Sequence, residues 1–86
     1  MENEYLNQLT ELVGVKFLPC KSSNLEGYAY NSHKQELWIA FKGNRVYKYK
    51  KVPYTVCNQL ATAKSKGTFH SQNIKGKYDY EGFELK

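Results

Sequence analysis

Acidic residues are missing from the middle of this sequence of 86 residues. Asp79 is its single aspartate, and no glutamate lies between Glu36 and Glu81. Two-metal nucleases and glycosidases need carboxylates in pairs, so residues 37–78 supply neither kind of site. The sequence also contains no P-loop, no dinucleotide fingerprint and no nucleophile elbow. We therefore expect a protein that binds a ligand without catalysis, with no cofactor and no metal.

Cysteines and long apolar runs are also scarce. The two cysteines, Cys20 and Cys57, are fewer than the roughly four to eight of a small secreted domain, which predicts reduced thiols in a cytoplasm. Together with His33 and His70 they lack the short ligand spacing of zinc sites. No apolar stretch approaches the roughly 20 residues that span a bilayer, and the acidic, amphipathic start does not resemble a signal peptide.

The cations form one block. Residues 42–77 contain nine lysines and arginines and no acidic residue, within a chain of net charge +5. A surface of one sign attracts phosphate groups, and salt screens this attraction over a Debye length of about 8 Å at physiological ionic strength. Two interpretations remain open: a face that binds nucleotides or nucleic acid, and a solvated face that keeps the protein in solution.

Hydrophobic periodicity predicts two helices. In residues 4–13 the apolar side chains recur every three or four positions and Gly14 follows, which indicates a short amphipathic helix. Pro53 precedes a second helical pattern, which we expect to extend to residue 66, with Gly67 just beyond its end. The lysines at that end would lie in the last turn, where cations complement the helix macrodipole.

Alternating aromatic and β-branched residues, separated by short polar turns, predict three antiparallel strands over residues 25–31, 36–42 and 45–52. Pro19 marks an edge strand before them, and the tail after Gly67 is expected to form a turn, a short extended piece and a final strand or arm. The predicted fold class is α+β: a small curved antiparallel sheet of three to five strands with one helix packed across it, plus the short N-terminal helix. We divide the chain into that amphipathic helix, residues 1–14, and a domain over residues 15–86.

The register of the last two strands determines which side chains form the core. With an odd number of residues in the loop around Gly43, the apolar side chains of Leu37, Ile39 and Phe41 share a face with Tyr47 and Tyr49. An even number would split the apolar residues between two faces, so we predict an odd loop and core positions for both tyrosines, with hydroxyl groups near a polar partner. The other face then carries Trp38, Ala40, Lys42, Val46, Lys48 and Lys50. Its tryptophan is either exposed for ligand contact or covered by the N-terminal helix or a second subunit.

A series of short motifs follows these elements. They comprise Ser22, Ser23 and Asn24, then Gly27 and Tyr28, Phe41, Gly43, Tyr47 and Tyr49, Val52 and Pro53, Ala63, Ser65, Gly67, Phe69, Ile74, Lys75 and Tyr78. The set, over roughly residues 20–80, resembles a KTSC domain, a small module found as a C-terminal extension of some lysyl-tRNA synthetases and as free-standing bacterial and phage proteins. Lys75 stands where arginine is usual in the family, which weakens the case for bidentate phosphate binding at that position.

This resemblance implies a small α+β fold, with one helix across a curved antiparallel sheet, and contact with nucleotides or nucleic acid. Free-standing phage copies resemble accessory proteins. We therefore expect a phage-encoded homo-oligomer that sequesters a phosphorylated nucleotide signal of host anti-phage defence, such as a cyclic di- or oligonucleotide, in the host cytoplasm. An RNA- or DNA-binding adaptor is the alternative. A metal-independent ribonuclease that uses His70 is a further alternative, although that histidine is otherwise expected to be a polar loop residue.

Residues 63–78 contain the hydroxyl groups, glycines, lysines and aromatic rings that a phosphate and base site requires. The other interpretation of this segment is a helix C-cap followed by a solvated basic arm. The binding interpretation combines this segment with the serine-serine-asparagine motif and with the strand face that carries Trp38, Lys48 and Lys50. The combination gives a set of predicted ligand-binding residues. These are Ser22, Ser23, Asn24, Tyr28, Trp38, Lys48, Lys50, Lys64, Ser65, Lys66, Gly67, Phe69, Lys75 and Tyr78.

Overall fold

The alternating aromatic and β-branched segments form the central sheet of the molecule. In the computed structural model, which describes residues 4–84, five strands pair in the order β1-β2-β3-β4-β5, each antiparallel to its neighbour. They are β1 (Leu18–Pro19), β2 (Leu25–Asn31), β3 (Glu36–Phe41), β4 (Arg45–Tyr49) and β5 (Tyr80–Glu84). The helices of the same part of the chain are α1 (Glu4–Val13), α2 (Tyr54–Thr62) and α3 (Lys66–Asn73). The predicted α+β class is confirmed.

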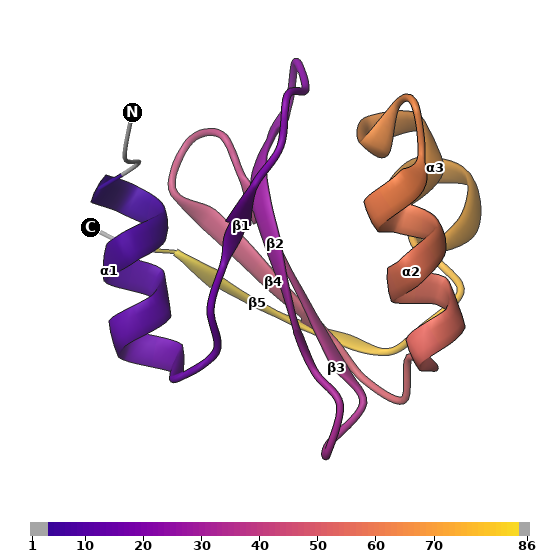
Figure 1. The fold of residues 1–86 in the computed structure, drawn as a ribbon, viewed down its shortest axis with the longest axis horizontal. Helices are drawn as coiled ribbons and strands as arrows, with labels where there is room; N and C mark the ends of the chain where they lie inside the picture. Colours follow the sequence, from indigo (N-terminus) through magenta and orange to yellow (C-terminus); the bar gives the residue numbers. More distant parts are fainter. Residues whose placement is uncertain (1–3, 85–86) are drawn as a thin grey trace.

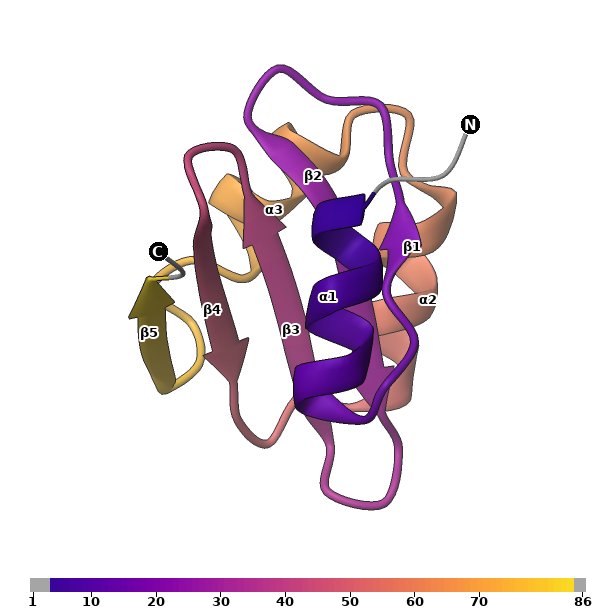
Figure 2. The same cartoon turned by 90° about the vertical axis from the view of Figure 1, so that its left-hand side faces the viewer.

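The helices cover both faces of the sheet. Figure 1 shows α1 on one side and α2 with α3 on the other, and Figure 2 shows α1 lying in front of the middle of the sheet. Two apolar clusters fill the spaces between these layers. The cluster on the side of α2 and α3 contains Leu25, Tyr28, Leu37, Ile39, Tyr49, Val52, Cys57, Leu60 and Ile74. The cluster under α1 contains Leu6, Leu9, Phe17, Ala29, Ala40 and Val46.

The N-terminal helix forms as its periodicity predicts. Leu6 and Leu9 are buried against the sheet, and Gly14 ends the helix with a φ of +82°. The Gly14 N–H donates to the carbonyl of Thr10, which satisfies one of the last helical carbonyls. None of the helices within residues 4–84 is long and apolar enough to cross a membrane.

The register between β3 and β4 confirms the odd loop. Three residues, 42–44, separate the strands, and Leu37 lies opposite Tyr49 as Ile39 lies opposite Tyr47. Tyr49 occupies the predicted core position, whereas Tyr47 is only partly buried, beside Tyr80 of β5. The shared face is confirmed for both tyrosines, and the predicted core position is confirmed for Tyr49, whereas Tyr47 packs at the border of the core.

The prediction of a single helix over residues 54–66 is wrong. The helix α2 ends at Thr62, because Ala63 has an extended backbone with a ψ of 139°. A new helix, α3, begins at Lys66, and the hydroxyl of Ser65 caps it by accepting a hydrogen bond from the N–H of Thr68. Gly67 therefore lies in the first turn of α3 rather than beyond a helix end, and the lysines of this segment do not lie in a last turn.

Close packing explains the glycine in the middle of β2. A Cβ atom at Gly27 would overlap the carbonyl oxygen of Leu18 in β1 and lie 2.8 Å from Cδ1 of Leu6 in α1. The register of β2 against β3 also shifts between Leu25 and Gly27, as at a β-bulge. Pro19 lies in the edge strand β1, as predicted.

Candidate functional site

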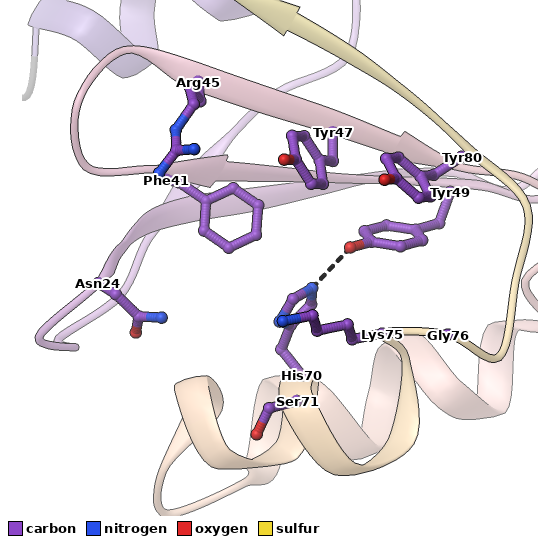
Figure 3. Close-up of a pocket in the computed structure, with 10 residues that line it drawn as sticks. All are labelled: Asn24, Phe41, Arg45, Tyr47, Tyr49, His70, Ser71, Lys75, Gly76 and Tyr80. Carbon is purple, nitrogen blue, oxygen red and sulfur yellow. Dashed lines mark hydrogen bonds between the residues drawn. The ribbon is translucent and has the colours of Figure 1, made fainter.

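A groove lies between α3 and the sheet, on the face away from α1 (Figure 3). Its volume is about 330 Å³. Figure 3 shows side chains entering it from the strands on one side and from α3 and the following segment on the other. The lining residues are Asn24, Phe41, Arg45, Tyr47, Tyr49, His70, Ser71, Lys75, Gly76 and Tyr80. Among residues 4–84, the charged side chains that line the groove are all cations.

The floor of the groove is a buried pair of polar side chains. The hydroxyl of Tyr49 and Nε2 of His70 form a hydrogen bond of 2.7 Å, and the two residues are 1% and 5% exposed. Burial, and secondarily the charge of Lys75, lowers the pKa of His70. Burial, with smaller contributions from Tyr47 and Tyr80, raises the pKa of Tyr49 to about 12. Both groups are therefore neutral near pH 7.

Aromatic rings form the wall on the side of the sheet. The rings of Tyr47 and Tyr80 stack with centroids 4.9 Å apart and an angle of 18° between their planes. Phe41 meets Tyr47 and His70 edge-on, at centroid distances of 5.0 and 5.1 Å. Such offset and edge-to-face contacts hold rings in fixed positions. Because Tyr80 is 54% exposed, its ring stays accessible to a ligand.

Two cations complete the groove. Arg45 begins β4, and Lys75 follows α3, so they approach the groove from opposite sides (Figure 3). Within residues 4–84 neither side chain forms a salt bridge with a carboxylate. A guanidinium and an ammonium group that lack a protein counter-ion are suited to hold a phosphate.

A second hollow, of about 470 Å³, adjoins the groove and shares Asn24 and Ser71 with it. It lies where the loop before β2 meets the start of α3. Its lining residues are Lys21, Ser22, Ser23, Asn24, Lys64, Ser65, Gly67, Thr68 and Ser71. As in the groove, the charged side chains that line it are all cations.

Several polar groups of the second hollow already have structural partners. The hydroxyl of Ser22 accepts hydrogen bonds from the N–H groups of Asn24 and Leu25 and lies 3.1 Å from Oδ1 of Asn24. A Cβ atom at Gly67 would lie 2.8 Å from that same oxygen. The serine-serine-asparagine motif and Gly67 therefore join the loop to α3, in addition to any role in binding.

The structure brings most of the predicted binding residues to this side of the molecule. Those that line the groove or the second hollow are Ser22, Ser23, Asn24, Lys64, Ser65, Gly67 and Lys75, and Lys50 and Tyr78 line a third hollow that adjoins the groove at Gly76 and Tyr80. Those that line none of these are Tyr28, Trp38, Lys48, Lys66 and Phe69. Tyr28 is buried, Phe69 packs against the core, and the ammonium of Lys66 donates to the carbonyl of Ala63.

The lysines of the predicted basic strand face, Lys48 and Lys50, form salt bridges with glutamates of β3 and β5. Lys48 Nζ lies 3.6 Å from Glu36 and 3.1 Å from Glu81, and Lys50 Nζ lies 3.4 Å from Glu81. Lys48 also lies over the ring of Trp38, 5.6 Å from its centroid. The tryptophan in turn stacks on Phe83, so it is partly covered, on the face that also carries α1.

Sequence reasoning missed Phe41, Arg45, Tyr47, Tyr49 and Tyr80 as residues of the groove, whereas Ser71 and Gly76 belong to the predicted binding segment 63–78 and His70 has a predicted role in the ribonuclease alternative alone. The expectation that His70 is a polar loop residue is wrong, because it is a buried residue of α3. Ser65 is of a residue type that is preferred at the N-cap of a helix, and this signal could have revealed α3. Residues 4–84 contain no cluster of three or more histidine, cysteine, aspartate or glutamate side chains that could hold a metal ion.

Comparison with known proteins places this geometry in a family. The family model described as the KTSC domain matches residues 21–78. The chain belongs to the KTSC domain family. The KTSC domain protein of Yersinia pestis, known from a crystal structure, superposes with a TM-score of 0.74 at 28% identity, over 84% of this chain and 99% of that one. The resemblance drawn from the short motifs is thus confirmed.

Curated relatives of this KTSC domain are much longer proteins. A lysine–tRNA ligase of Trichormus variabilis is 37% identical over 73 residues, and one of Nostoc sp. is 33% identical over the same length. Each alignment covers 85% of this chain and 13% of the ligase. The KTSC domain therefore corresponds to a small part of those enzymes.

Proposed function

We propose that this KTSC domain binds a phosphorylated nucleotide in the groove between α3 and the sheet and does not transform it. The observation that carries the proposal is the placement of two cations, Arg45 and Lys75, beside a wall of packed aromatic rings. Base rings stack on aromatic side chains, and phosphate oxygens accept charge-assisted hydrogen bonds from guanidinium and ammonium groups. Together these groups supply both halves of nucleotide recognition.

The charge of the surroundings supports an anionic ligand. Within the described part of the chain, the groove and the hollow that adjoins it at Asn24 and Ser71 are lined by four cations and no carboxylate. The buried His70 is neutral near pH 7, so it adds hydrogen-bonding capacity without adding charge. The names of the ligase relatives refer to tRNA, which agrees with a ligand made of nucleotides.

The role that we propose is sequestration. A protein that binds a phosphorylated signal such as a cyclic di- or oligonucleotide and leaves it intact lowers the free concentration of that signal. In a phage-encoded protein this would silence a host defence that depends on the signal. Phage infection of cells that carry a nucleotide-activated defence tests this role. Expression of this protein should reduce the protection that the defence gives. Undiminished protection would reject the role.

Calorimetric titration tests the binding itself. We expect at least one of AMP, ATP, cyclic di-AMP and cyclic di-GMP to bind the purified protein at micromolar concentration. Arg45→Ala and Lys75→Ala should each weaken that binding about tenfold or more, the loss expected for one charge-assisted hydrogen bond. Lys48→Ala is the matched control, because Lys48 lies on the opposite face of the sheet and should leave the affinity unchanged. Absence of binding, or an equal loss in all three variants, would contradict the proposal.

An RNA-binding adaptor is the competing binding function, and salt separates the two. A polymer that is contacted at many phosphates loses affinity steeply as salt rises, whereas a ligand with one or two phosphates does so gently. If a single-stranded RNA of 20 nucleotides binds with a steep salt dependence and the small nucleotides do not bind, the adaptor function replaces sequestration.

A ribonuclease function is favoured by one observation, the presence of His70 in the same groove as Arg45 and Lys75. Histidine serves as acid or base, and cations stabilise a pentavalent phosphate, without metal. Its burial opposes this role. Cleavage of RNA in EDTA by the wild type, lost in His70→Ala and kept in Lys48→Ala, would establish the enzyme; intact RNA supports binding without catalysis.

A further inference from the structure

The groove continues into a third hollow at its other end. This hollow has a volume of about 560 Å³ and shares Gly76 and Tyr80 with the groove. Its lining residues are Lys50, Gly76, Lys77, Tyr78, Asp79 and Tyr80. The second and third hollows share no residue with each other. The three spaces therefore follow one another in a row, with the groove in the middle.

Each of the three spaces contains two cations. The second hollow has Lys21 and Lys64, the groove has Arg45 and Lys75, and the third hollow has Lys50 and Lys77. In the third hollow the ion pair of Lys50 with Glu81 and the presence of Asp79 reduce the positive charge. Lys77 remains there as a cation without a salt bridge among residues 4–84.

Aromatic rings line two of the three spaces, and hydroxyl groups line the other. The groove and the third hollow share the exposed ring of Tyr80, and the third hollow adds Tyr78. The second hollow offers hydroxyl groups, among them Ser23 and Ser71. Cations that follow a backbone, with aromatic rings placed between them, are how proteins hold single-stranded nucleic acids.

We propose that the ligand consists of three nucleotides linked by phosphodiester bonds, linear or cyclic, with one unit in each space. This inference rests on the proposed nucleotide binding in the groove and names the size of the ligand. A mononucleotide would fill the groove and leave the cations of both outer hollows without phosphate. Each further unit adds a phosphate near Lys64 or Lys77, and a base that meets the ring of Tyr78 in the third hollow or the hydroxyl groups of the second.

Calorimetry on the full chain with a series of ligands of increasing length tests the size of the ligand. The probes are AMP, the linear di- and triadenylates and cyclic triadenylate, with a uridylate ladder in parallel. We expect the affinity to rise by about tenfold or more with each added unit, in line with the gain from one charge-assisted phosphate contact or one stacked base. The comparison of the linear with the cyclic trinucleotide shows which form fits the row.

Variants at the two ends of the row supply the control. Lys64→Ala and Lys77→Ala should weaken trinucleotide binding and leave AMP binding unchanged, while Lys48→Ala should change neither. If AMP binds as tightly as the trinucleotide, or if the two end variants do not affect the trinucleotide, the three-unit ligand is rejected and nucleotide binding in the groove still stands. If no probe of any length binds, both proposals are rejected.

Discussion

The hydroxyl of Tyr49 lies 2.7 Å from Nε2 of His70, and this hydrogen bond joins β4 to α3 at the floor of the groove. Both residues are almost fully buried. A buried polar group that loses its partner cannot turn to water, so each side chain of this pair depends on the other. The same bond therefore supports the packing of α3 and the shape of the candidate site.

Removal of the Tyr49 hydroxyl is expected to destabilise the fold. Tyr49→Phe leaves His70 without its partner in a buried position, which should lower the free energy of unfolding by about 1–3 kcal/mol. Urea unfolding followed by far-UV circular dichroism measures this. Tyr54→Phe is the control, because Tyr54 is 63% exposed. Equal stabilities of Tyr49→Phe and the wild type would show that the bond contributes nothing.

The pKa of His70 predicts a stability that falls in mild acid. Burial lowers this pKa in the folded state below the ordinary value of 6.5, whereas the unfolded chain keeps the ordinary value. Below about pH 6.5 the unfolded state therefore binds a proton that the folded state does not, and the free energy of unfolding decreases as the pH falls. Unfolding measured from pH 7.5 to 5 should show this slope.

Two variants isolate the contribution of His70 from that of the carboxylates. His70→Phe keeps a ring of similar size and should flatten the slope below pH 6.5. His33→Gln changes an exposed histidine in the turn between β2 and β3 and should leave the slope as in the wild type. A slope that is the same in all three proteins would assign the acid sensitivity to other groups.

The docking of α1 predicts a large loss of stability at one leucine of the helix and almost none at another. Leu9 is buried against the sheet, and Leu12 is 70% exposed. Leu9→Ala should cost about 2–5 kcal/mol, because it leaves a cavity in the cluster under α1. Leu12→Ala should change the stability by less than about 0.5 kcal/mol. Thermal or urea unfolding of both variants checks this, and a similar loss for both would mean that α1 packs differently.

The contact of Gly67 with Asn24 can be tested by a double-mutant cycle. Gly67→Ala brings a Cβ atom within 2.8 Å of Asn24 Oδ1, so it should destabilise the protein by about 1–3 kcal/mol. In the background of Asn24→Ala this oxygen is absent, and the same substitution should cost less. Additive losses in the double variant would show that the two residues do not meet.

The strands and α1 could be predicted because their signals are local. A period of two along residues 25–49 and a period of three to four along residues 4–13 show directly which side chains face a core. The odd loop followed from the need for one apolar face, and the pairing of Leu37 with Tyr49 confirms it. For α3 the local signal is weak: its sequence KGTFHSQN contains a glycine and one large apolar residue, Phe69. The cap at Ser65 and the burial of His70 and Ile74 against the sheet stabilise this helix instead.

For the candidate site, the sequence was sufficient to show that residues 42–77 are basic and poor in carboxylates, and that Tyr47 and Tyr49 share a face. It could not show which part of that face the helices leave open. Arg45, His70 and Tyr80 meet in one groove because α3 packs against a face of the sheet at β4 and β5 pairs with the edge of β4, and these contacts join segments that are not adjacent in the sequence. The carboxylates of Glu36 and Glu81 reach Lys48 for the same reason. A periodic pattern fixes the direction of a side chain, whereas its neighbours depend on long-range packing.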